Sequence, residues 1–98
     1  MLSPKNRAYL KSLANSLKPS LIIGKGEIDD TLIKSIDNAL VAHELIKIKI
    51  LPNSELEPIE LFDIIATKTK SEKVSKIGRI LTLYRRNEKN PRITLLEK

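Results

Sequence analysis

The side chains that could support catalytic chemistry are few and scattered. His43 is the single histidine, there is no cysteine, and Lys47 stands where a zinc-protease helix would carry its second histidine. The adjacent acids Asp29 and Asp30 are explained by capping of a helix. Because acid–base, nucleophilic and metal chemistry all need clustered groups, we expect no enzymatic activity, no metal site and no cofactor.

A glycine turn is a stronger candidate site. Gly24, Lys25 and Gly26 follow a short apolar run and precede a predicted helix, without the spacing of a nucleotide-binding P-loop. Backbone N–H groups at such a turn can face outward, and a helix N-terminus favours anions. Glycine lets a sugar-phosphate backbone approach closely and Lys25 adds a charge, as in the glycine loop of KH domains. The alternative is that both glycines only satisfy a tight turn.

A second group of candidates surrounds a predicted hairpin. Gly78 and Arg79 separate two β-type runs, and Arg85 and Arg86 follow the second run. Arginine binds phosphate through two parallel hydrogen bonds and stacks on bases. Tyr84 could stack on an unpaired base or belong to the core. Since aromatic residues make up 3% of the chain, we expect contacts mainly to phosphate rather than an aromatic stacking platform.

The charged residues are segregated along the chain. Residues 1–26 contain five basic residues and no acid, residues 27–63 contain nine acids and three lysines, and residues 64–98 contain ten basic residues and three acids. If the two ends fold together, they form a basic face opposite an acidic one, which would attract and orient a polyanion. The candidate contacts from the N-terminal block are Lys5, Arg7 and Lys11. The alternative is that these side chains are only solvated.

The periodicity of the first half predicts the elements that hold these groups. Ser3 and Pro4 are typical of the N-cap and first turn of a helix, which Pro19 would end. Its buried stripe would be Leu10, Leu13, Ala14 and Leu17. A buried strand over 20–23 leads into the glycine turn, and Asp29 is the expected N-cap of a second helix.

The second half alternates between strand and helix patterns. Residues 45–51 predict a half-buried strand with isoleucines on one face and lysines on the other. Ser54 and Glu57 have the spacing of a capping box that would open a third helix. The side chains expected to face inward from that helix are Ile59, Phe62, Ile65 and Ala66. Further strands are predicted over 73–77, 80–84 and 93–96, the last as an edge strand.

The order helix, strand, helix, strand, helix, strand, strand predicts a compact α/β sandwich with a mixed four-stranded sheet. The chain of 98 residues fits one domain, and a hydrophobic share of 41% suffices for one core. No apolar run approaches the roughly 20 residues that cross a bilayer, and the N-terminus is polar and basic. We therefore expect a cytoplasmic monomer without membrane contact.

Several segments carry a resemblance to a known family. They are LIIGKG at 21–26, HELIKIKI at 43–50 and IGRILTLYR at 77–85, with Leu13-Ala14 and Leu17-Lys18-Pro19 in the first helix. In this order and spacing they resemble the CRM domain (chloroplast RNA splicing and ribosome maturation), in its YhbY-like, single-domain bacterial form. The resemblance covers nearly the whole chain.

The resemblance implies a fold similar to the C-terminal domain of bacterial translation initiation factor three. It implies RNA binding and, for stand-alone members, association with precursors of the large ribosomal subunit. It maps the family's glycine loop onto residues 24–27, with Glu27 where relatives usually carry glycine. On this basis we predict an accessory factor of ribosome assembly whose partner is ribosomal RNA in those precursors.

Other functions remain open on the sequence alone. The face formed by Lys47 and Lys49, or the acidic helices, could dock a protein partner. The chain could also be a general nucleic-acid-binding protein without a ribosomal role, because the phosphate contribution does not separate RNA from double-stranded DNA.

Overall fold

Three helices and four strands make up the fold in the computed structural model, which describes residues 2–25 and 28–95. In chain order the elements are α1 (Pro4–Ala14), β1 (Leu21–Ile23), α2 (Asp30–His43), β2 (Leu45–Ile50), α3 (Pro58–Thr69), β3 (Glu72–Ile77) and β4 (Ile80–Tyr84). This order confirms the predicted α/β class and element sequence.

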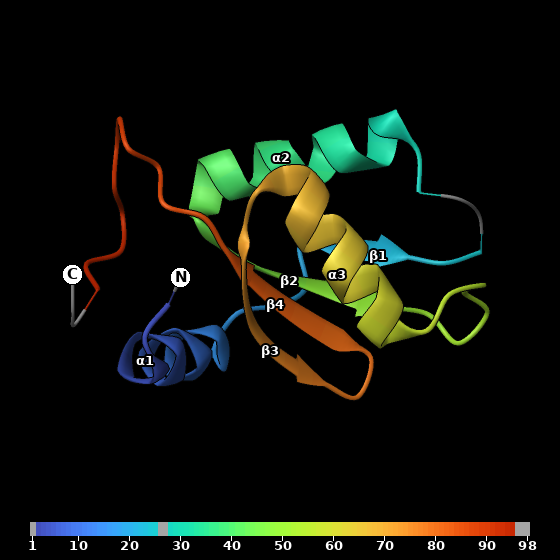
Figure 1. Ribbon diagram of the computed structural model, residues 1–98, viewed down its shortest axis with the longest axis horizontal. Coiled ribbons are helices and arrows are strands. Elements are labelled where there is room, and N and C mark those ends of the chain that lie inside the picture. Colours follow the sequence, from blue (N-terminus) through green and yellow to red (C-terminus); the bar gives the residue numbers. More distant parts are fainter. Residues whose placement is uncertain (1, 26–27, 96–98) are drawn as a thin grey trace.

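The strands form one mixed sheet in the order β1-β2-β4-β3. β1 runs parallel to β2, whereas β2 and β4, and β4 and β3, are antiparallel. The α2 and α3 helices cover one face of this sheet, and α1 lies on the other (Figure 1). The molecule therefore has three layers, with the single helix α1 unable to cover its whole face of the sheet.

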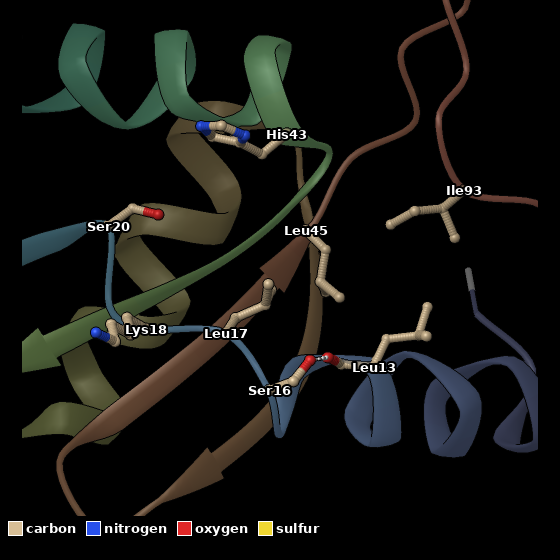
Figure 2. Close-up of a pocket in the computed structure, with 8 residues that line it drawn as sticks. All are labelled: Leu13, Ser16, Leu17, Lys18, Ser20, His43, Leu45 and Ile93. Atoms are coloured by element: carbon tan, nitrogen blue, oxygen red, sulfur yellow. Dashed lines mark hydrogen bonds between the residues drawn. The ribbon is translucent and has the colours of Figure 1, made fainter.

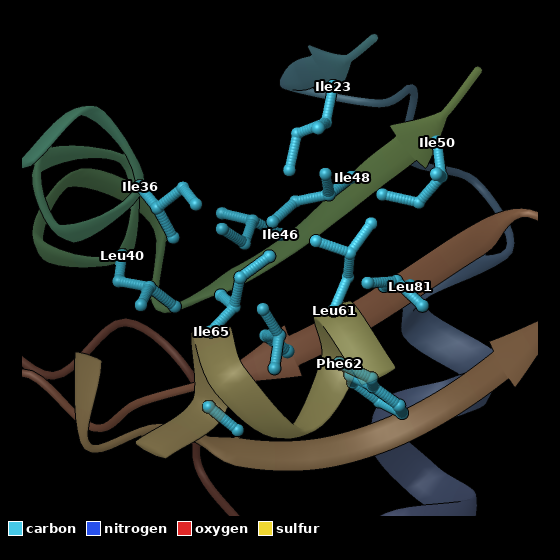
Figure 3. Close-up of a cluster of buried hydrophobic side chains, with 12 residues drawn as sticks. Ile23, Ile36, Leu40, Ile46, Ile48, Ile50, Leu61, Phe62, Ile65 and Leu81 are labelled. Atoms are coloured by element: carbon cyan, nitrogen blue, oxygen red, sulfur yellow. The ribbon is translucent and has the colours of Figure 1, made fainter. Parts of the chain in front are cut away.

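The larger hydrophobic core lies between the sheet and the α2/α3 layer (Figure 3). Ile46, Ile48 and Ile50 alternate along β2 and are fully buried there, which confirms the alternation predicted for this strand. The α2 and α3 side chains that meet them include Ile36, Leu40, Leu61, Phe62 and Ile65. Because a strand presents every second residue to the same face, the lysines between these isoleucines lie on the α1 side.

A smaller hydrophobic cluster lies under α1. Leu10 and Ala14 of the helix pack with Leu45, Val74 and Tyr84 at one end of the sheet. The helix ends at Ala14, so the predicted extension to Pro19 is wrong, and Leu17 is exposed beyond it. A backbone hydrogen bond from Leu17 N–H to the Ala14 carbonyl continues the turn without continuing the helix.

Side-chain caps start two of the helices as predicted. The Ser3 hydroxyl accepts from the Asn6 N–H at 3.0 Å, and the Asp29 carboxylate accepts from the Leu32 N–H at 2.8 Å. The capping box predicted for the third helix is wrong. Glu57 is the N-cap of α3 without a side-chain hydrogen bond, and the Ser54 hydroxyl donates to the Leu56 carbonyl instead.

Two further expectations for the second half are corrected. Ile59 is 55% exposed, because Leu61, at 2%, takes the inward position on α3 together with Phe62. Residues 93–95 form no strand, although Ile93 and Leu95 pack against the cluster under α1. Leu96, the last residue of the predicted strand, lies outside the described residues.

A buried carboxylate holds the segment after β4. Glu44, fully buried at the C-terminal end of α2, accepts backbone hydrogen bonds from Asn87 at 2.7 Å, Arg92 at 2.6 Å and Ile93 at 2.8 Å. The segment passes the end of α2 and turns back toward α1 (Figure 1). Hydrogen bonds to an ionised acceptor are stronger than neutral ones, so Glu44 fixes the path of this segment.

Candidate nucleic-acid interface

The glycine turn begins where β1 ends, at one end of the sheet. Gly24 lies against the loop after β2, and a Cβ at this position would stand only 3.2 Å from Leu51 Cδ1 and 3.6 Å from Asn53 Oδ1. Close packing rather than an unusual backbone angle therefore favours glycine here, since a larger residue would push the Leu51 side chain aside by a few tenths of an ångström. Lys25 is exposed beside it, whereas Gly26 lies outside the described residues.

The start of α2 is already occupied by the chain's own acids. Asp29 caps the helix through its carboxylate, and Asp30 stands in the first turn. The Asp29 carboxylate takes the Leu32 N–H, and both acids offset the positive end of the helix dipole that an incoming phosphate would otherwise meet. An anion at the glycine turn would therefore depend on Lys25 rather than on the end of α2.

The hairpin turn places Arg79 at the same end of the sheet as Lys25. The Leu51 N–H donates to the Ile23 carbonyl, and the Leu51 carbonyl accepts from the Arg79 guanidinium at 3.3 Å. Gly78 makes the turn possible with a φ of 59°, which glycine adopts without strain. Leu51 thus ties the glycine turn and the hairpin turn to each other.

The three predicted bases of α1 do not form one group. Arg7 and Lys11 stand four residues apart on one side of the helix, and the Arg7 side chain donates to the Lys73 carbonyl of β3 at 3.3 Å. Lys11 is exposed and lines a small pocket between the C-terminal half of α1 and the sheet. Lys5 is also exposed, in the first turn of the helix, away from that pocket.

The arginines after β4 lie at the opposite end of the sheet from Arg79. Arg85 forms an ion pair with Asp37 of α2 and donates to the Thr69 carbonyl of α3 at 2.8 Å. Arg86 pairs with Glu88 at 3.4 Å. The structure therefore does not bring these two side chains together with Lys25 and Arg79, and Arg85 connects α2, α3 and β4 at their shared end.

Tyr84 is a core residue and not a base-stacking surface. It is 3% exposed within the cluster under α1, which supports the core interpretation of the two that the sequence allowed. Burial, and next the charge of Glu44, raise the pKa of its hydroxyl above the ordinary value of 10.0. Among the described residues, no group accepts or donates a hydrogen bond at that hydroxyl.

Lys47 and Lys49 belong to the same face as Lys11, although neither is among the predicted nucleic-acid contacts. Both project from β2 toward the α1 side, and the Lys47 ammonium donates to the Leu17 carbonyl at 3.2 Å. Lys47 also lines the pocket that Lys11 borders. The alternation of lysines and isoleucines along 45–50 showed these lysines facing outward, but not which helix lay beside them.

The acidic residues occupy the other side of the molecule. Residues 29–43 and 55–69, which contain α2 and α3, carry seven acids and two lysines. The basic face consists of the α1 side of the sheet and the turns beside it, with Arg7, Lys11, Lys25, Lys47, Lys49 and Arg79.

His43 ends α2 and borders a separate pocket of about 420 Å³ (Figure 2). Most of the other walls are leucine and isoleucine side chains from α1, the segment after it, β2 and the C-terminal segment, namely Leu13, Leu17, Leu45 and Ile93. Within the described residues, no three His, Asp or Glu side chains gather so as to hold a metal ion.

Comparison with known proteins places this fold in a family. Residues 2–85, from the start of α1 to the end of β4, match the CRS1/YhbY (CRM) domain. The chain belongs to the CRM-domain family. The match spans the glycine turn, β2 and the hairpin, which are the segments that carry the resemblance seen in the sequence.

Individual CRM-domain relatives match over nearly their full length. The Bacillus subtilis protein named Probable RNA-binding protein YqeI is 36% identical over 95 residues, covering 97% of this chain and 99% of its own. A Haemophilus influenzae protein named RNA-binding protein is 37% identical over 87 residues, covering 89% and 88%. The solution structure of the Staphylococcus aureus protein SAV1595 shares 40% identity and a TM-score of 0.80, covering 97% and 99%.

None of the helices in the described ranges combines the length and apolar character needed to cross a bilayer.

Proposed function

We propose that this protein binds RNA through its basic face and acts as an accessory factor of ribosome assembly on precursors of the large subunit. The observation that carries the proposal is the segregation of charge between the two sides of the sheet. Side chains from α1, the glycine turn, β2 and the hairpin turn bring cations to one side, and α2 and α3 bring acids to the other. Such a dipolar protein would be both attracted and oriented by a polyanion.

The availability of the cations supports phosphate contact. Within residues 2–25 and 28–95, no carboxylate forms an ion pair with Lys11, Lys25 or Lys49. Arg79 uses one guanidinium nitrogen for the Leu51 carbonyl, which leaves further donors for a phosphate oxygen. The names of the relatives, which describe RNA-binding proteins, support RNA over DNA as the ligand.

Charge reversal tests the RNA contact directly. We expect Lys11→Glu with Lys25→Glu to weaken binding to a ribosomal RNA fragment, and to lower the slope of log affinity against log salt by about two. Lys34→Glu with Lys68→Glu is the matched control, because both are exposed lysines of the acidic layer, on α2 and α3. Equal losses in the double variant and the control would show that the basic face is not the contact surface.

The ribosomal role is tested by sedimentation of a cell lysate through a sucrose gradient at moderate salt. We expect the protein to move with immature large-subunit particles and to leave them after RNase treatment. A protein that stays at the top of the gradient at low salt, while still binding RNA in vitro, would contradict the ribosomal role and leave RNA binding intact.

The remaining parts of the proposal concern how the protein works. It acts by binding, without catalysis, as a monomer in the cytoplasm. Capture of one stable protein partner after RNase treatment would favour the alternative of a protein-interaction module, whose contact surface would then be the Lys47/Lys49 face or the acidic helices.

A further inference from the structure

Four residues form a continuous row across the part of the sheet that α1 leaves open. In the strand register Ile22 of β1 lies opposite Lys49 of β2, Lys49 opposite Ile80 of β4, and Ile80 opposite Ile77 of β3. Their neighbours Ile23, Ile48, Ile50 and Leu81 point into the core on the other face. We call these four residues, Ile22, Lys49, Ile80 and Ile77, the open row.

The open row exposes apolar surface that the fold does not use. Ile22 is 61% exposed and Ile77 is 58% exposed, because α1 ends at Ala14 before reaching them. The next row along the sheet, with Lys47, is partly covered by the end of α1, where the small pocket lies. With strands spaced about 4.8 Å apart, the open row spans roughly 14 Å, so its occupant must present apolar surface over that length.

Cations surround this apolar surface. Lys49 stands within the row, Lys11 borders it across the pocket that contains Ile77 and Ile80, and Arg79 adjoins Ile80 in the hairpin turn. Lys25 follows β1 at the same end of the sheet. A purely apolar partner would have to bury the Lys49 ammonium without a counter-charge, which is unfavourable. An unpaired nucleotide segment presents flat apolar bases and a phosphate at every step.

We infer that the open row is a binding site for the faces of unpaired bases in the RNA. The inference rests on the proposed function and adds to it the kind of RNA recognised. Base faces pack on apolar side chains as well as on aromatic ones, and a duplex hides those faces between its stacked pairs. The open row therefore selects a single-stranded loop or bulge, while Lys11, Lys25, Lys49 and Arg79 bind its phosphates.

The test compares two probes of equal length and charge. One is a hexamer of uridylate, and the other is an abasic ribose-phosphate hexamer. We expect the wild-type protein to bind the uridylate hexamer more tightly. Replacing Ile22 and Ile77 by threonine keeps the β-branched shape that suits a strand, and removes apolar surface. This double variant should lose about tenfold in affinity for uridylate and little for the abasic probe, with an unchanged salt slope.

Ile59→Thr is the matched control, because Ile59 is 55% exposed on α3, on the opposite side of the molecule. Urea unfolding of each variant checks that the fold is kept. Two outcomes would overturn the open row as a base site without contradicting RNA binding. One is equal affinity of the wild type for both hexamers, and the other is binding to a duplex but not to uridylate. Binding to no RNA probe would contradict the proposed function itself. If the wild type is a dimer and the double variant is a monomer, the open row is instead the contact surface for a second copy of this chain.

Discussion

Replacing the buried carboxylate of Glu44 by an amide should release the C-terminal segment without unfolding the domain. One carboxylate oxygen accepts from the backbone of Arg92 and Ile93, and the other accepts from the backbone of Asn87. In Glu44→Gln the negative charge is lost and one oxygen becomes an NH₂ group. The NH₂ group is a donor and would face a backbone N–H, which is also a donor, so at least one of the three hydrogen bonds cannot form.

The size of the effect follows from the kind of bond removed. A hydrogen bond to a charged group contributes about 1.5–3 kcal/mol, and a buried donor left without a partner costs about 1–3 kcal/mol. In the variant the segment can detach and its amides can bond to water. The loss of free energy therefore cannot exceed the free energy of attachment of the segment. We therefore expect the opening free energy of the segment to fall by about 1.5–3 kcal/mol, which is roughly a 10- to 100-fold faster amide exchange.

Hydrogen exchange measured by NMR on the backbone amides of Asn87, Arg92 and Ile93 is the assay. Core amides such as that of Ile48 should exchange as in the wild type, because the sheet stays formed. Glu88→Gln is the control, since Glu88 lies in the same segment with a side chain that is 81% exposed. Unchanged exchange of the three amides in Glu44→Gln would refute the view that this carboxylate holds the segment.

Three further substitutions test single features of the fold. Tyr84→Phe should leave stability near neutral pH unchanged or raise it by up to about 1 kcal/mol, because among the described residues the hydroxyl has no hydrogen-bond partner. Because burial raises the Tyr84 pKa, the wild type should lose stability as the pH rises above 10, and Tyr84→Phe should lose less in pH-dependent urea unfolding. Arg85→Lys keeps the charge but removes the planar guanidinium that reaches both Asp37 and Thr69, so we expect a destabilisation of about 1–3 kcal/mol in urea unfolding. Unchanged stability together with weaker RNA binding would show instead that Arg85 contacts the ligand. Lys70→Gly should stabilise the protein by about 0.5–1 kcal/mol in thermal unfolding, because Lys70 has a φ of 54° at the C-cap of α3 and glycine adopts this angle without strain. A loss of stability would mean that contacts of the lysine side chain contribute more than the relief of strain.

Local patterns predicted the parts of the fold that depend on near neighbours. The alternation of β2 gave both the strand and its buried face, and the caps at Ser3 and Asp29 lie three residues from the amides they bind. The capping box at Ser54 failed because α3 begins at Pro58 with Glu57 as its N-cap, three residues later than the box requires, and the Ser54 hydroxyl donates to the Leu56 carbonyl. A polar side chain near a helix start has several such acceptors, and spacing alone does not choose among them.

Contacts between distant parts of the chain could not be predicted from these patterns. Arg85 meets Asp37 across 48 positions of sequence, and Glu44 meets Ile93 across 49. Neither pair has a periodicity that would reveal it. From the sequence alone, an arginine next to a strand is equally consistent with a ligand contact and with a structural ion pair. The sequence therefore could not separate these two roles for Arg85.

The strand register explains why one predicted basic patch became two separate groups. Arg79 and Arg85 stand at opposite ends of β4, and a strand of five residues is about 17 Å long. The antiparallel pairing with β2 sets Arg79 beside Leu51 and the glycine turn, and sets Arg85 beside Glu44 and the end of α2. The acids of α2 reach one end of the sheet through Asp37, whereas the other end has Lys25 and Lys49 exposed. Identical residue types therefore differ in their ion pairs. Arg85 is held by Asp37, whereas within the described residues no carboxylate forms an ion pair with Lys25, Lys49 or Arg79, and these cations stay available to a phosphate.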